Sequence, residues 1–150
     1  MNLKTVVDDF VSQKSYAVIG VSRNARKFGN VIYKELKKKG IKAYPVNPNI
    51  NEFEGEKCYP GLADIPGRVD GAIINVPPAQ AEKVVIDAYT SGINKVWLQQ
   101  GSQSEKAVEY CKEHNIDYVS NECILMFLES AAFIHRAHKW IWGVVGKLPQ

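Results

Sequence analysis

The chain of 150 residues has few cysteines and no long apolar run. Its three cysteines, Cys58, Cys111 and Cys123, lie far apart and do not follow the spacing of a metal site. Such a small, odd set argues against a disulfide framework and favours the reducing cytoplasm. No stretch reaches the roughly 20 apolar residues of a membrane-spanning helix, and residues 1–13 lack the apolar core of a signal peptide. We therefore expect a cytoplasmic protein with no membrane partner.

An excess of charge is also lacking, since the net charge is only +3. Much of the basic excess lies between Lys14 and Lys42. This distribution suits a small anionic ligand better than nucleic acid, which usually requires a stronger basic stripe. The hydrophobic content of 45% and the charged content of 23% are ordinary for a globular protein. The length is sufficient for one domain with a real core.

Apolar runs and helical spacing alternate from Ser15 onward. The runs predict five strands, at 16–20, 41–46, 69–76, 95–98 and 116–119. Helices are predicted to begin near residues 28, 78, 104 and 124, the last reaching Ile134, and a short helix is expected at 6–11. This order predicts an α/β fold, a doubly wound, Rossmann-like, five-stranded parallel sheet in a single domain. We expect its core at about 14–137 and an apolar tail at 138–150.

Right-handed crossovers would bring all the strand-to-helix loops to one edge of this sheet. The predicted loops are residues 20–29, 47–49, 75–78, 99–103 and 120–123. In open α/β sheets ligands bind at the carboxyl ends of the strands, near the point where the strand order reverses. The sequence therefore predicts a ligand site at this edge.

The first of these loops has the character of a phosphate loop. Gly20 ends an apolar run and would let the chain turn sharply and approach a ligand closely. Arg23, Arg26 and Lys27 follow, and Gly29 lies at the start of the next helix. Free amides in such a loop and at a helix start bind phosphate, and the cations add attraction. A phosphorylated, nucleotide-like ligand is expected.

Two common nucleotide motifs are absent. The dinucleotide pattern needs a second glycine where Ser22 stands and an acid after the second strand, where Asn47 stands. The phosphate loop of the P-loop ATPases is missing too. An NAD(P)-binding oxidoreductase and a nucleotide-responsive regulator remain the alternative functions. Against the regulator, the 13 residues before the first strand cannot form a winged helix for DNA.

An ordered set of short pieces matches a known family. The pieces are Gly20–Ser22 with Lys27–Gly29, Tyr44–Pro48, Cys58–Pro66, Asn75–Pro78, Val96–Gly101 and Asn121–Cys123. Together they resemble the stand-alone CoA-binding domain family, which is similar to the CoA-binding N-terminal domain of the succinyl-CoA synthetase alpha subunit. The resemblance covers roughly residues 16–128.

The resemblance implies coenzyme A or an acyl-CoA as the ligand. It implies that Asn47 and Pro48 lie near the adenosine. It places the phosphates at Gly20, Val21, Ser22, Arg23 and Lys27, with Phe28 and Gly29 completing the motif. Asn75, Val76 and Pro77 would line the adenine or pantetheine path, and Gln99, Gly101 and Cys123 would lie toward the thiol.

Two departures from the family limit what the resemblance implies. Members often carry a lysine directly after the Asn-Pro pair, where this chain has Asn49, so Arg23, Arg26 or Lys42 would have to supply that cation. The domain with the synthetase's phosphorylated histidine has no counterpart in this sequence. No catalytic residue is therefore assigned, and a carrier, sensor or subunit is expected rather than an enzyme.

Some residues also have purely structural interpretations. Ser22 can simply bond its own turn. Cys123 is either a packed apolar residue or a helix-terminal thiol of lowered pKa that could form a mixed disulfide with CoA. The apolar tail either folds back or meets a partner chain, and we favour a homo-oligomer through it.

Overall fold

The computed structural model describes residues 2–24 and 26–132. Five parallel strands form the central sheet in the order β2-β1-β5-β6-β7. These strands are β1 (Ser15–Ile19), β2 (Lys42–Val46), β5 (Gly71–Ile74), β6 (Lys95–Gln99) and β7 (Asp117–Glu122). The helices are α1 (Leu3–Val11), α2 (Phe28–Lys38), α3 (Pro78–Thr90), α4 (Glu105–Glu113) and α5 (Leu125–Ala132). The predicted α/β, Rossmann-like fold is confirmed.

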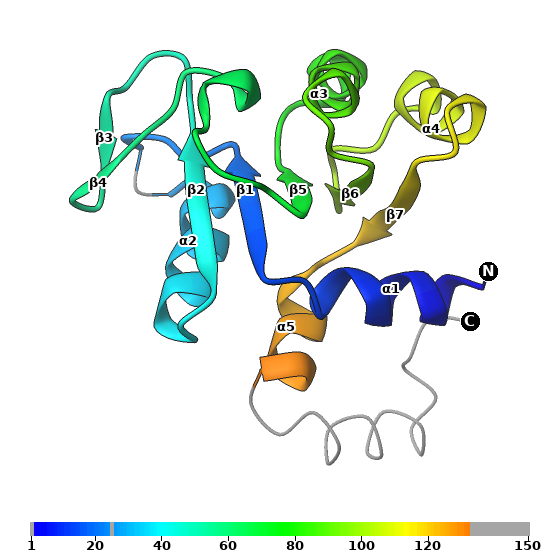
Figure 1. The fold of residues 1–150 in the computed structure, drawn as a ribbon, viewed down its shortest axis with the longest axis horizontal. Coiled ribbons are helices and arrows are strands. Elements are labelled where there is room, and N and C mark those ends of the chain that lie inside the picture. Colours follow the sequence, from blue (N-terminus) through cyan, green and yellow to red (C-terminus); the bar gives the residue numbers. More distant parts are fainter. Residues whose placement is uncertain (1, 25, 133–150) are drawn as a thin grey trace.

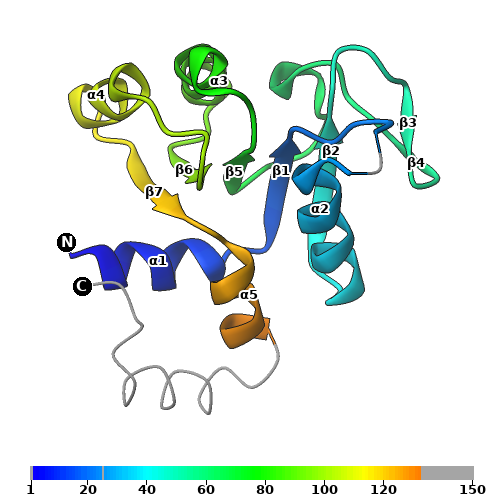
Figure 2. The ribbon, with the colours of Figure 1, turned by 180° about the vertical axis from the view of Figure 1, so that it is seen from behind.

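Helices cover both faces of the sheet because successive strand residues point to opposite sides. Val18, Ile73 and Trp97 pack in one buried cluster with residues of α1, α2 and α5. Their neighbours Ala17 and Ala72 belong to a second cluster, with residues of α3 and α4. Figures 1 and 2 show these two sets of helices on opposite sides of the sheet.

Two strands differ from the prediction by more than one residue at an end. The third parallel strand, predicted at 69–76, is confined to β5, and Asn75 already belongs to the loop that leads to Pro77. The last strand, predicted at 116–119, continues to Glu122, so most of the predicted loop at 120–123 is strand. A register shift between Leu98 and Gln99 lets Gln99 pair with Glu122. These polar residues carry no apolar pattern, so the sequence offered no signal for the extension.

A short antiparallel hairpin, not predicted from the sequence, follows β2. It consists of β3 (Glu52–Phe53) and β4 (Glu56–Lys57), and a 3-10 turn, η1 (Leu62–Asp64), comes later in the same connection. Between them, the Tyr59 amide donates to the Pro45 oxygen and the Tyr59 oxygen accepts from the Asn47 amide, both at 2.9 Å. Tyr59 therefore covers the carboxyl end of edge strand β2.

The described part of the last helix ends at Ala132. The predicted continuation to Ile134 and the apolar tail at 138–150 lie outside the described residues. Among residues 2–24 and 26–132, no helix is long and apolar enough to cross a membrane.

A three-residue ion-pair network ties the N-terminal helix to the sheet. We expect Lys95→Met to lower the free energy of unfolding by about 0.5–1 kcal/mol, since partly exposed ion pairs contribute little. The Lys95 ammonium lies 2.7 Å from an Asp9 carboxylate oxygen and 3.3 Å from one of Asp117. Lys83→Met, which breaks an exposed pair with Asp87, is the control and should cost less. Urea unfolding at pH 7 measures both changes.

The hydrogen bond to Asp9 raises the pKa of Lys95, although burial opposes the rise. A raised pKa in the folded state means that the stabilisation is complete below the unfolded value of about 10.4 and is lost as pH rises through the folded value. The difference in the free energy of unfolding between Lys95→Met and the unmodified protein should therefore become smaller in strongly alkaline solution. A difference that grows there would contradict this account.

Candidate ligand site at the carboxyl edge of the sheet

The order of the strands reverses direction at β1 and β5. From β1 the chain moves outward to β2, whereas β5, β6 and β7 follow on its other side. The helix after β1 packs in one layer and the helix after β5 in the other. The loops after these two strands therefore diverge at the place where ligands bind in such sheets.

Gly20 lets three backbone segments meet at this point. Its φ of +125° is unfavourable for any residue with a side chain, and a Cβ there would overlap the carbonyl oxygen of Asn75. A Cβ on Gly29 would in turn overlap the carbonyl oxygen of Gly20. The sharp turn expected at Gly20 is thus present, and the close approach there is to the protein's own backbone.

A buried asparagine on α2 fixes the shape of the first loop. Asn30 is 3% exposed. Its Oδ1 accepts from the Ser22 amide at 2.8 Å, and its Nδ2 donates to the carbonyl oxygens of Ser22 at 2.8 Å and Asn24 at 3.1 Å. The Ser22 hydroxyl accepts from the Asn24 amide at 3.1 Å, which is the turn bond expected of it. The loop is therefore held from within.

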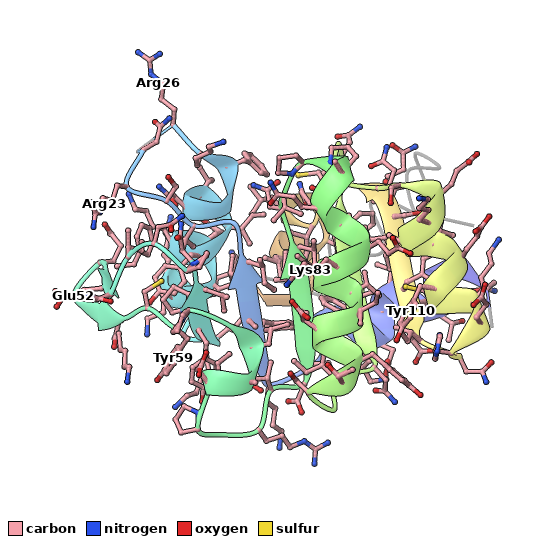
Figure 3. The ribbon with its side chains drawn as sticks, turned by 90° about the horizontal axis from the view of Figure 1, so that it is seen from above. Arg23, Arg26, Glu52, Tyr59, Lys83 and Tyr110 are labelled. Atoms are coloured by element: carbon pink, nitrogen blue, oxygen red, sulfur yellow. The ribbon has the colours of Figure 1, made fainter. Side chains whose placement is uncertain are left out.

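Groups that could receive an anion remain on this loop. The amides of Val21 and Arg23 donate to no described residue, although Val21 itself is only 1% exposed. Arg23, Arg26 and Lys27 are exposed, and Lys27 caps the N-terminus of α2, whose first turn holds no acid. Figure 3 shows Arg26 extending away from the body of the molecule. The loop combines positive charge, free amides and a helix start, an arrangement suited to phosphate.

Asn47 joins the second loop to the first. Its Nδ2 donates to the Val21 oxygen at 2.7 Å, and its Oδ1 accepts from the Asn49 amide at 2.7 Å. Both ends of this side chain are thus used within the protein, while Pro48 beside it is exposed. Asn47 stands where a dinucleotide site has its acid, and it binds loops together instead.

The structure separates the three cations that could replace the lysine missing at Asn49. Lys42 lies at the amino end of β2, where its Nζ sits 5.3 Å from the centre of the Tyr44 ring. Four residues of strand, roughly 13 Å at 3.3 Å each, separate it from the carboxyl end of β2. Arg23 and Arg26, on the loop that Asn47 contacts, are the better placed cations.

A hydrogen bond also joins the third loop to the fourth. Ser102, 2% exposed, accepts from the Val76 amide at 3.1 Å through its hydroxyl and donates its own amide to the Gln99 oxygen at 2.7 Å. Asn75 donates its amide to the Ile19 oxygen at 2.8 Å. Pro77 and Gly101 are exposed on these loops. Sequence reasoning missed Ser102, whose partner Val76 lies 26 residues away, and Asn30, because nothing in the sequence shows that this side chain is buried.

Gln99 links the sheet to the last helix. It is 2% exposed, and its Oε1 accepts from the Ile124 amide at 3.0 Å. Cys123 precedes that helix and is half-buried, with its carbonyl accepting from the Met126 amide at 3.2 Å. The structure thus brings the predicted site residues after β6 and β7 to neighbouring positions.

The other two cysteines are buried away from solvent. Burial raises the pKa of the Cys58 thiol, and it raises that of Cys111 to about 12. Within residues 2–24 and 26–132, no group of three or more His, Cys, Asp or Glu side chains is placed to hold a metal.

Comparison with known proteins gives this arrangement a family. The model of a CoA binding domain matches residues 14–129. The chain belongs to this CoA-binding domain family. The matched region contains the whole sheet and all five loops at its carboxyl edge.

The relatives are of two kinds. Subunit alpha of the ADP-forming acetate–CoA ligase II of Pyrococcus furiosus is 32% identical over 130 residues, which cover 79% of this chain and 28% of the relative. The uncharacterized protein YneT of Bacillus subtilis is 30% identical over 113 residues, or 74% of this chain and 82% of YneT. The chain thus spans less than a third of that ligase subunit and most of YneT.

A solved structure shows the same fold. A conserved hypothetical protein from Pyrococcus furiosus is 37% identical, with a TM-score of 0.71 over 75% of this chain and 97% of its own. The expected resemblance to a stand-alone CoA-binding domain is confirmed.

Substitutions at two glycines test the backbone contact. We expect Gly20→Ala to lower the free energy of unfolding by about 1–3 kcal/mol more than Gly92→Ala, which is the cost of overpacking. Gly92 also has a positive φ, of +88°, but a Cβ there meets nothing within 4 Å. Urea unfolding of both variants measures the difference, and equal losses would contradict the contact with Asn75. Because Gly20 packs on the protein itself, its variants test the fold before they test a ligand.

Proposed function

We propose that this chain binds coenzyme A or an acyl-CoA at the carboxyl edge of its sheet. Membership of the CoA-binding domain family over residues 14–129 carries the proposal. The loop after β1 would hold the diphosphate through the free amide of Arg23, assisted by Lys27. The exposed surface at Pro48 would lie beside the adenosine.

The remaining site residues follow the length of the ligand. The loop from Asn75 to Pro77 would border the adenine or pantetheine, while Gln99, Gly101 and Cys123 would lie toward the thiol. Arg23 and Arg26 are the cations that we assign to the 3′-phosphate, because Lys42 is at the other end of β2. Of the two arginines, Arg23 is the nearer in sequence to Val21. The Val21 oxygen accepts the hydrogen bond from Asn47 that joins this loop to the second one.

We further propose a carrier, a sensor or a subunit of a larger assembly as the role. The acetate–CoA ligase relatives are several times longer than the segment they share with this chain. We assign no catalytic group to the site. The apolar tail at 138–150 offers a means of association with a second copy.

Ligand choice is the direct test of this function. CoA should raise the melting temperature, because a ligand that binds only the folded state stabilises it by about 2.7 kcal/mol at 100 times its Kd. NAD at equal concentration should raise it much less, since Ser22 and Asn47 replace the glycine and the acid of a dinucleotide site. Thermal unfolding with each ligand measures the shifts. Stabilisation by NAD equal to that by CoA would favour the oxidoreductase instead.

Cys123 provides a probe of the thiol end of the site. We expect CoA lacking its sulfur to slow the alkylation of Cys123 by a maleimide at least fivefold, because bound pantetheine would cover this half-buried thiol. Cys58 and Cys111 are buried and serve as internal controls. Peptide mapping with the reaction followed over time measures each cysteine. An unchanged rate at Cys123 under saturating ligand would remove it from the site.

A further inference from the structure

Asn30 has a role that the family resemblance does not assign. It is a polar residue at the third position of α2, in the first turn, where a solvent-facing side chain would be ordinary, yet it is 3% exposed. Its amide group makes three hydrogen bonds, all to backbone atoms of the loop after β1. A buried amide with three backbone partners costs free energy to desolvate, and these bonds offset that cost.

The partners of Asn30 reveal what it controls. Oδ1 accepts a hydrogen bond from the Ser22 amide, and Nδ2 donates hydrogen bonds to the carbonyl oxygens of Ser22 and Asn24. Asn30 thus turns the Ser22 amide and both carbonyls inward, toward α2. The amides on either side of Ser22, those of Val21 and Arg23, keep no described partner. The Asn30 side chain therefore determines which backbone groups of the loop are already hydrogen-bonded within the protein.

The neighbouring glycine explains why Asn30 can reach the loop. Gly29 lies against the carbonyl oxygen of Gly20, where a Cβ would overlap it. This contact brings the first turn of α2 directly against the end of β1, so the residue after Gly29 meets the loop that follows Gly20. A larger residue at 29 would push the helix away and break the geometry of all three Asn30 bonds.

We propose that Asn30 is the positioning residue of the phosphate loop, holding it in its binding conformation before the ligand arrives. The role rests on the proposed function. A loop fixed in advance does not have to lose conformational entropy on binding, so the gain appears as affinity. Asn30 acts through the backbone of Ser22 and Asn24 and need not touch the ligand.

Three variants separate positioning from charge and from folding. Asn30→Ala removes all three bonds. Asn30→Asp keeps the acceptor for the Ser22 amide but loses the donor to the two carbonyl oxygens. Asn24→Asp is the matched control, because it adds the same charge to the same loop and keeps the Oδ1 acceptor that serves the Arg26 amide at 3.0 Å.

Calorimetric titration with CoA at pH 7.5 gives the affinities. We expect the Kd to rise at least tenfold for Asn30→Ala and Asn30→Asp, and less than threefold for Asn24→Asp.

Hydrogen exchange without ligand reports on the loop itself. In Asn30→Ala the Ser22 amide should exchange at least tenfold faster, while Ala17 and Val18 in β1 stay protected. If Asn30→Ala does not fold, Asn30→Asp, which keeps the acceptor for the Ser22 amide but loses the donor, carries the affinity measurement.

Several results would overturn the role. Unchanged affinity in a folded Asn30 variant would do so, as would unchanged exchange at Ser22 in Asn30→Ala. A loss in Asn24→Asp as large as that in Asn30→Asp would assign the effect to charge. If the unmodified protein binds no CoA, the proposed function fails and this role with it, an outcome that the first titration separates from a failure of Asn30 alone.

Discussion

The meeting of three backbones at Gly20 is the constraint on which the candidate site depends. The end of β1, the start of α2 and the loop after β5 approach so closely that neither Gly20 nor Gly29 has room for a side chain. Because the contacts are between main-chain atoms, side-chain repacking cannot relieve an intrusion. The loop can hold its position relative to the sheet only because residues 20 and 29 are glycines without a Cβ.

Buried side-chain amides and hydroxyls then connect the loops to one another. Asn30 holds the first loop, Asn47 joins the second to the first, Ser102 joins the third to the fourth, and Gln99 fixes the start of α5. Each bond spans two elements that meet only in the folded chain. A parallel sheet brings its loops to one edge, and these polar links convert that proximity into a defined surface.

The sequence predicted the strands, their parallel arrangement and the edge at which the loops gather, since these follow from apolar periodicity and from the handedness of the crossovers. It identified Gly20 but assigned its freedom to a ligand rather than to Asn75. It missed Asn30, because an asparagine inside a helix gives no sign of being buried. The polar end of β7 was missed for a related reason: its pairing depends on a register shift opposite Gln99.

The treatment of β2 has a consequence for the solubility of the chain. An edge strand with open hydrogen-bonding groups can recruit strands from other molecules and nucleate aggregation. Here Tyr59 occupies the carboxyl end of that edge, and Pro45, the residue before the last in β2, has no amide proton to offer. An incoming strand would find an interrupted ladder. The same connection that brings the second loop to the site thereby keeps the sheet from growing sideways.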